Sequence, residues 1–344
     1  MTLPVRRDER NADPPSRVTR RLGVAVGFLA PVLFVTCRGD QSALDPASPE
    51  ARDVATLWWV LFAISAVVVA VVTMLVLVAS LRRPRALQRG WGGMGLVVVG
   101  GVIVPFLILV VVFVITVATL PSVSAPPRGE ARVTVDVIGR QFWWEVRYPD
   151  PGFVTANEIH IPTDTPVELR VRSRDVIHSL WVPRLSRKID MIPGRTNRIL
   201  IRADAPGVYR GQCAEFCGLA HAQMAFLVIA ETPDRFAGWV SAQAGDAAAP
   251  VEDGAAQGQE VFLSSSCVAC HTIRGTEATA AVGPDLTHLA GRRWLGAGTV
   301  PNTRGNLGGW IVDPQRIKPG NRMPPTSLSG PELQALLDYL ETLE

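Results

Sequence analysis

The sequence predicts a multi-domain membrane protein with a two-helix transmembrane hairpin, a β-sandwich or β-barrel domain, and an all-α C-terminal domain. Two apolar runs, residues 57–81 and 95–120, are each long enough to cross a bilayer. Short alternating segments separated by turn residues fill 129–243, a pattern typical of β-sandwiches. Helical signals dominate 255–344, after a small-residue linker at 244–254. These three observations predict the fold class.

The first element is an apolar run at residues 22–36, which follows an Arg-rich start. It is short for a membrane span and typical of the core of a signal peptide, so residues 1–36 are expected to be absent from the mature chain. Cys37 comes directly after the run, where a lipoprotein signal would be cleaved and lipid attached. A free or buried cysteine is the alternative.

The hairpin occupies residues 54–120, and its orientation follows from charge. The short loop between the spans carries four arginines, Arg82, Arg83, Arg85 and Arg89. By the positive-inside rule this loop is cytoplasmic, so everything after Leu120 lies outside a bacterial cell membrane. Two buried helices of a soluble core are the alternative. The net charge is only +3 and the basic residues form no patch, so lipid, and not nucleic acid, is the expected partner.

The C-terminal domain carries the motif CVACH, with Cys267, Cys270 and His271. Two thiols at this spacing can each add to a haem vinyl group, and the adjacent histidine then reaches the iron. A thioredoxin-like pair or half a zinc site are the alternatives. Met323, in a Pro-rich segment, is the predicted sixth ligand of the haem. The domain ends in a predicted helix that opens with a capping box at Ser329 and Glu332.

The segment GQCAEFCGLAHAQM predicts a second redox centre. Cys213, Cys217, His221 and Met224 lie within twelve residues, and His178 supplies a second imidazole. This soft ligand set suits copper in electron transfer, and a second thiolate favours two metal ions over one. A zinc site and a disulfide are the alternatives. The remaining histidines, His160 and His288, are expected to be structural residues in solvated turns or strands.

These motifs resemble two known families. Residues 54–240 resemble subunit II of the haem–copper cytochrome c oxidases, and 255–344 resemble class I cytochrome c, where Gly258, Phe262 and Tyr339 match the helix-crossing contact. The first resemblance implies a cupredoxin-like β-sandwich with a dinuclear copper centre, CuA.

The resemblance also assigns ligands. Cys213 and Cys217 would bridge the coppers, His178 and Met224 would complete one copper, and the remaining ligands, His221 and the carbonyl of Glu215, would complete the other. The Glu215 side chain would reach a magnesium or manganese ion shared with subunit I.

The function implied by the resemblance is electron entry into a proton-pumping oxidase. A cytochrome bc complex or a cytochrome c would reduce the haem, and the electron would pass through CuA to subunit I, where oxygen is reduced to water. With five histidines in all, the chain has no oxygen-reducing site of its own. An electron-entry subunit of a CuA-type nitric oxide reductase and a standalone membrane-anchored redox carrier are the alternatives.

Two departures from the family pattern stand out. Where many members carry an electron-entry tryptophan, this chain has Phe142, so Trp143 becomes the candidate entry residue. No acidic residue occurs between Leu81 and Gly129, where the family often has a proton-channel glutamate. Another subunit then supplies that carboxylate, or proton uptake differs.

Overall fold

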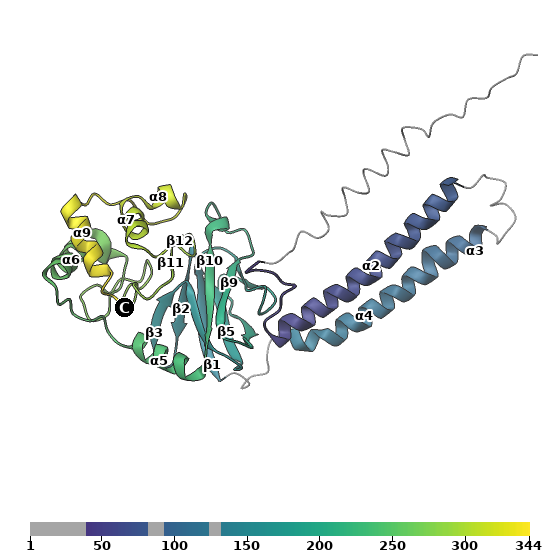
Figure 1. The fold of residues 1–344 in the computed structure, drawn as a ribbon, viewed down its shortest axis with the longest axis horizontal. Coiled ribbons are helices and arrows are strands. Elements are labelled where there is room, and N and C mark those ends of the chain that lie inside the picture. Colours follow the sequence, from purple (N-terminus) through teal and green to yellow (C-terminus); the bar gives the residue numbers. More distant parts are fainter. Residues whose placement is uncertain (1–38, 82–92, 124–131) are drawn as a thin grey trace, which may run out of the picture. The chain divides into compact units, whose positions relative to one another are not determined.

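The computed structural model describes residues 39–81, 93–123 and 132–344. Within these ranges it confirms the predicted fold class: two apolar helices, a β-sandwich and a helical C-terminal domain (Figure 1). The predicted signal peptide, Cys37 and the Arg-rich loop lie outside the described residues.

Helix α2 (Pro49–Leu81) and helix α4 (Val104–Val123) form the hairpin and lie side by side in Figure 1. Helix α3 (Gly93–Val98) and the π-helical turn η2 (Val99–Ile103) lead into α4. The most apolar stretch of each span is wholly unburied within the protein, as expected for helices that face lipid. Length, composition and exposure therefore agree with a membrane hairpin.

Helix α2 begins at Pro49, before the predicted hairpin start at residue 54 and before the apolar run that begins at residue 57, because its first turns are held by the β-sandwich. The Ser48 hydroxyl accepts a hydrogen bond from the Ala51 amide at 3.0 Å and donates one to the Leu185 carbonyl at 2.6 Å. Arg52 forms an ion pair with Asp204. This polar start leaves no signal in hydropathy, which is why apolarity alone places the boundary too late.

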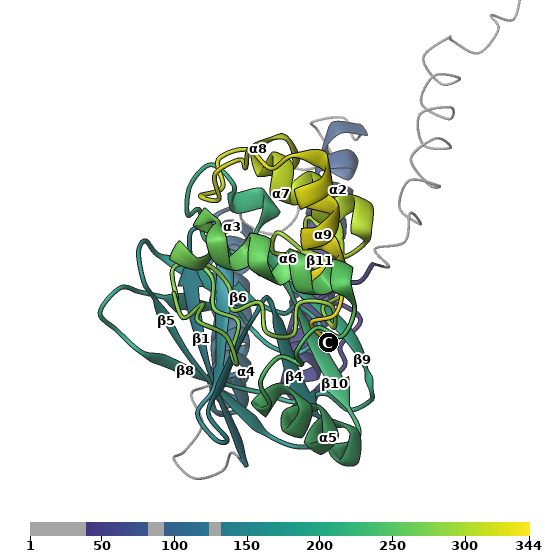
Figure 2. The same ribbon diagram turned by 90° about the vertical axis from the view of Figure 1, so that its left-hand side faces the viewer.

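The β-sandwich consists of two five-stranded sheets (Figure 2). The first has the order β3-β2-β1-β5-β8 and the second β4-β10-β9-β6-β7, with parallel pairs at β1/β5 and β4/β10 and antiparallel pairs elsewhere. The strands are β1 (Val133–Arg140), β2 (Trp143–Tyr148), β3 (Phe153–Ala156), β4 (Glu158–Pro162), β5 (Val167–Ser173), β6 (His178–Trp181), β7 (Ile189–Met191), β8 (Asn197–Ile201), β9 (Gly207–Cys213) and β10 (Ala225–Glu231). Alternating apolar side chains from both sheets form one core.

Helix α5 (Pro233–Ala244) follows β10, within the range 129–243 that the sequence analysis assigns to the β-sandwich domain. Phe236, Trp239 and Val240 pack against the sandwich core. The irregular segment before the next helix is therefore 245–252, because α6 begins at Asp253.

His160 holds helix α5 against the sandwich. The prediction that His160 is solvated is wrong. Its ring is 8% exposed, stacks on Trp239 with ring centroids 3.8 Å apart, and places Nδ1 3.0 Å from a Glu231 oxygen. Burial lowers the pKa of His160, but hydrogen bonds with Glu158 and Glu231 raise it, and the net pKa lies above its usual value. His288 is buried too, so the predicted solvated setting is wrong for both histidines.

Glu231→Gln is expected to destabilise the sandwich in a pH-dependent way. Because the folded-state pKa of His160 is raised, its pairing with Glu231 stabilises the fold fully below the unfolded pKa of about 6.5 and is lost as pH rises through the folded pKa. The expected loss is about 1 kcal/mol at a pH of about 6, and much less at about 9. Calorimetry of the detergent-solubilised protein at both pH values measures it. The exposed Glu252→Gln is the control, and an equal loss at both pH values would contradict this pairing.

The C-terminal domain is built around the crossing of α6 (Asp253–Ser264) and α9 (Gly330–Leu340), seen in Figure 2. A Cβ at Gly258 would lie 1.9 Å from the Ala335 carbonyl oxygen, so only glycine permits this approach. The predicted capping box at the start of α9 is confirmed. The smaller elements are the 3-10 turn η4 (Ser266–Ala269), strands β11 (Trp294–Leu295) and β12 (Val300–Pro301), and helices α7 (Arg304–Val312) and α8 (Pro314–Ile317).

Candidate metal centre and haem cavity

Two paired strands position the first ligands of the candidate metal centre. His178 is the first residue of β6 and Cys213 is the last of β9, and the register of the pair places Leu180 opposite Cys213. The Cys213 amide donates to the Met224 carbonyl at 2.9 Å, which closes the intervening loop at its base. Residues far apart in the sequence therefore meet at one end of the sheet.

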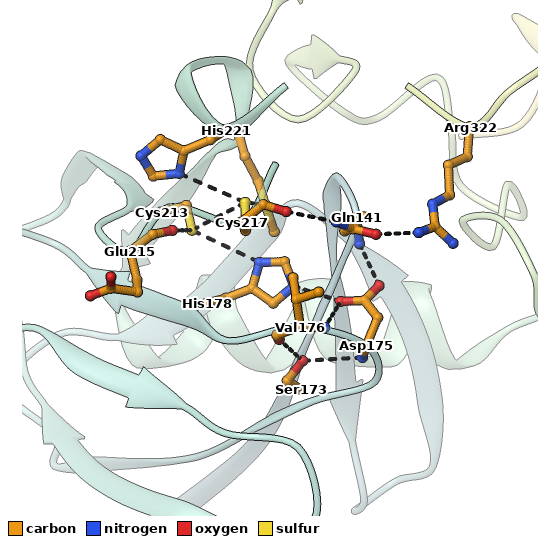
Figure 3. Close-up of polar contacts among 11 residues, drawn as sticks. Gln141, Ser173, Asp175, Val176, His178, Cys213, Glu215, Cys217, His221 and Arg322 are labelled. Atoms are coloured by element: carbon orange, nitrogen blue, oxygen red, sulfur yellow. Dashed lines mark hydrogen bonds and ion pairs between the residues drawn. The ribbon is translucent and has the colours of Figure 1, made fainter. Parts of the chain in front are cut away.

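The structure brings five predicted ligands into one cluster, and Figure 3 labels four of them, all but Met224. The two sulfur atoms of Cys213 and Cys217 lie 3.8 Å apart. His178 Nδ1 lies 3.9 Å from Cys213 Sγ, and His221 Nδ1 lies 3.7 Å from Cys217 Sγ. Met224 Sδ lies 3.7 Å from Cys217 Sγ.

These distances fit metal ligation better than a disulfide. A disulfide holds its sulfurs about 2.05 Å apart, whereas Cys213 and Cys217 are both free thiols 3.8 Å apart. Donor atoms about 2.0–2.3 Å from a tetrahedral metal are roughly 3.3–3.8 Å from one another. The cluster is therefore spaced to close around metal ions with little movement.

The hydrogen bond between Cys213 and Cys217 prepares one of the two thiols for a cation. The hydrogen bond between the two thiols lowers the pKa of Cys213 and raises the pKa of Cys217, while burial raises the pKa of both. Without metal, the pair releases its first proton easily and its second with difficulty. Bound cations favour loss of both protons, because the metal ligand is the thiolate.

The neighbours of His178 fix its orientation. Its Nε2 lies 2.8 Å from Asp175 Oδ1, which leaves Nδ1 turned toward Cys213. A Cβ at Gly139 would lie 2.8 Å from the imidazole, so the absence of a side chain there makes room for the ring. A carboxylate that holds the far nitrogen of a metal-binding histidine fixes its tautomer and raises its basicity. Asp175 was missed in the sequence, although its position three residues before a candidate ligand is a usable signal.

Gln141 is a second residue that sequence reasoning missed. Its backbone amide donates to Asp175 Oδ2 at 2.7 Å, and its side-chain Nε2 donates to the Cys217 carbonyl at 2.6 Å. The Gln141 side chain thus reaches from the turn after β1 to the loop between β9 and β10, residues 214–224, which we call the copper-ligand loop (Figure 3).

The predicted haem ligands line one cavity of about 400 Å³, which also contacts the sandwich. Cys267, Cys270, His271 and Met323 all belong to its lining. His271 donates its Nδ1–H to the Pro284 carbonyl at 2.7 Å, so Nε2 keeps a lone pair for a metal. Burial lowers the pKa of His271, which favours the neutral ligand form. The residues present therefore fit a haem.

The remaining predicted residues have different surroundings. The Glu215 carbonyl lies 3.2 Å from Cys213 Sγ, at the metal cluster, whereas its carboxylate is half exposed and lies 3.8 Å from Lys188 Nζ. Trp143 is half-buried, lines the haem cavity, and has the Arg140 guanidinium 5.3 Å from its ring centroid. Phe142 is 7% exposed, with its side chain in the sandwich core.

Comparison with known proteins finds matches to both domains. A family model described as cytochrome c oxidase subunit II, periplasmic domain, matches residues 152–231, and one described as cytochrome c matches 255–344. Cytochrome c oxidase subunit 2 of Alkalihalophilus pseudofirmus is 36% identical over 325 residues, which cover 91% of this chain and 94% of that protein. The chain belongs to the cytochrome c oxidase subunit 2 family.

Further relatives match over smaller parts of the chain. Cytochrome c oxidase subunit 2 of Bacillus subtilis is 32% identical over 70% of this chain and 73% of its own length. The crystal structure of the periplasmic domain of subunit II of cytochrome oxidase from Bradyrhizobium japonicum is 31% identical. It matches 35% of this chain and 97% of that chain, with a TM-score of 0.33.

Membership in the subunit 2 family shows the general function of the chain and the complex to which it belongs. The chain is a component of an oxidoreductase complex, and its partners are subunit I and other subunits of a haem–copper oxidase. The two matched domains imply copper in the β-sandwich and haem in the C-terminal domain. The two apolar helices anchor these extracytoplasmic domains to a membrane.

Proposed function

We propose that this chain is the electron-entry subunit of a proton-pumping, oxygen-reducing haem–copper oxidase. A haem c, covalently bound, and a dinuclear copper centre would each supply a one-electron relay when bound. The observation that carries the proposal is that one chain holds the cysteine–histidine cluster and a cavity lined by CVACH, and that both touch Gln141. The donor would be a cytochrome bc complex or a cytochrome c.

In this proposal the copper cluster is held by side chains that keep water out. Cys213 and Cys217 would bridge the metals, and His178 and Met224, which are 0% and 1% exposed, would complete the ligands of one of them. The half-buried His221 and the Glu215 carbonyl would complete the ligands of the other. Asp175 holds His178 in one orientation, so little has to move when charge passes.

The haem residues divide their roles in the same way. Cys267 and Cys270 would form the thioether links, while His271 and Met323 would offer nitrogen and sulfur to the haem iron. The Met323 segment is fixed by its own hydrogen bonds, with the Met323 amide donating to Asn321 Oδ1 at 2.8 Å. A rigid loop holds a weak thioether ligand at low entropic cost.

Several finer features belong to the proposal. The chain would be a bacterial multi-pass membrane protein that has lost residues 1–36, with lipid on Cys37 as an option. The Glu215 carboxylate would bind magnesium or manganese together with subunit I. Because no acidic residue lies between Leu81 and Gly129, the carboxylate for proton uptake would come from another subunit.

Metal analysis of the purified wild-type complex tests the proposal. We expect about two copper atoms per haem c, as two bridging thiolates imply, and an EPR signal from one electron shared between two copper nuclei. Co-purification with an oxygen-reducing subunit I is expected. Zinc in place of copper, a thiol count reduced by two, or a nitric oxide-reducing partner would each contradict it.

A further inference from the structure

The segment Ile317–Arg322, which we call the haem-ligand loop, leads directly to Met323 and contacts the sandwich at several points. Three hydrogen bonds cross between them: Lys318 Nζ to the Phe142 carbonyl at 2.7 Å, Gln223 Nε2 to the Ile317 carbonyl at 3.2 Å, and the Arg322 guanidinium to Gln141 Oε1. A Cβ at Gly320 would lie 2.7 Å from Leu219 Cβ, so the two backbones also approach closely. The haem-ligand loop therefore contacts both the β1–β2 turn and the copper-ligand loop.

Lys318 is the most unusual member of this contact. The side chain is 1% exposed, and Nζ donates to the Phe142 carbonyl and to the Gly296 carbonyl, each at 2.7 Å. Burial lowers the pKa of Lys318 to about 7. Two carbonyl acceptors satisfy two N–H groups whether or not the amine carries its third proton, so the bridge does not depend on its charge. One amine thus joins the sandwich to the C-terminal domain.

Gln141 continues the contact to the copper ligands. Its Oε1 accepts from Arg322, which lines the haem cavity, while its Nε2 donates to the Cys217 carbonyl at 2.6 Å (Figure 3). Two hydrogen bonds therefore connect the residue next to Met323 with the peptide of a predicted bridging cysteine. Trp143 also lines the cavity, but no hydrogen bond that the structure gives for the described residues joins its indole to the copper-ligand loop.

We propose that the haem-ligand loop is a fixed electron bridge, in which Lys318 is the positioning residue that docks the haem domain and Gln141 is the route into the copper centre. This inference rests on the proposed function, because it needs both redox centres. With both groups bound, one electron would pass from the reduced haem to the copper centre, with no bond formed or broken. The turn at Gln141 and Phe142 then serves as the entry point through its amide and carbonyl groups, and no tryptophan ring is required at position 142.

Lys318→Leu tests the docking role, with Arg316→Leu as the matched control. Both variants replace a long cation by leucine, but Arg316 is exposed, two residues earlier. In the full-length complex, Lys318→Leu is expected to speed hydrogen exchange in peptides covering residues 139–145 and 214–224. Flash-induced electron transfer from haem to copper should slow by about tenfold or more, as a loss of alignment predicts. Haem content, copper content and both reduction potentials should stay unchanged.

Two further variants separate positioning from simple packing. Lys318→Gln keeps a hydrogen-bond donor and should give intermediate values for exchange and transfer, and it replaces the leucine variant if that one does not assemble. Gln141→Ala should slow transfer without releasing the Lys318 contact. Wild-type exchange and transfer in the Lys318 variants, with both centres loaded, would overturn the inference. Wild-type protein without copper or haem c would instead overturn the proposed function.

Discussion

Cys217→Ser is expected to abolish the dinuclear copper signal and to lower electron flow from haem c to oxygen roughly a hundredfold or more, since a bridging thiolate selects copper and serine does not replace it. Cys217 is the hub of the cluster, with Cys213, His221 and Met224 sulfur or nitrogen atoms within 3.8 Å. EPR, copper analysis and oxygen uptake measure the loss. Haem c should remain present and reducible, because the haem domain has its own hydrophobic core.

Two other substitutions in the same loop serve as comparisons for Cys217→Ser. Ala222→Ser introduces the same side chain at an exposed position and should leave copper and activity unchanged. Met224→Leu should keep copper and shift its reduction potential, because a weak axial thioether tunes the metal more than it holds it. Survival of oxidase activity in Cys217→Ser, together with wild-type protein lacking copper, would instead support a disulfide.

The candidate copper cluster could be predicted from the sequence because the types of its residues, cysteine, histidine and methionine, indicate metal binding. Four ligands lie within twelve residues, and the search for a second imidazole leads to His178, which the β6–β9 pairing places beside Cys213. Soft side chains are scarce enough in this chain that their spacing carries information. The haem motif could be found for the same reason.

The residues that support the cluster could not be found in this way. Gln141 and Lys318 act through hydrogen bonds to the carbonyls of Cys217, Phe142 and Gly296, and a backbone carbonyl is present at every position. Their partners depend on how two domains dock, which no local pattern encodes. Phe142 shows the same limit: its identity differs from the family pattern, while the structure uses its carbonyl oxygen.

The membrane helices could be predicted from the sequence and helix α5 could not, because different forces stabilise them. The membrane spans follow from apolar length alone, which the bilayer demands. Helix α5 has twelve residues, of which only three are large and apolar, and its position depends on Trp239 stacking against the buried His160 ring. Tertiary packing, and not intrinsic propensity, stabilises such a short helix.

Met323→His is the second change with a large expected effect. Covalent haem should be retained, because the thioether links involve Cys267 and Cys270 and not Met323. The reduction potential of haem c should fall by roughly 0.1–0.3 V, within the span of about 0.8 V that axial ligands cover, because imidazole stabilises ferric iron better than a thioether does. Potentiometric titration of the haem c absorption band measures the shift.

Geometry makes Met323 the candidate in the described part of the chain, since it lines the same cavity as His271 while the Asn321 side chain holds its amide. Ser327→His is the matched control: it adds an imidazole to the same segment at an exposed position and should leave the potential unchanged. A lowered potential slows entry from the donor and speeds transfer toward copper, so reduction of haem c should become limiting in Met323→His. An unchanged potential and spectrum in Met323→His would show that another group occupies the second axial position.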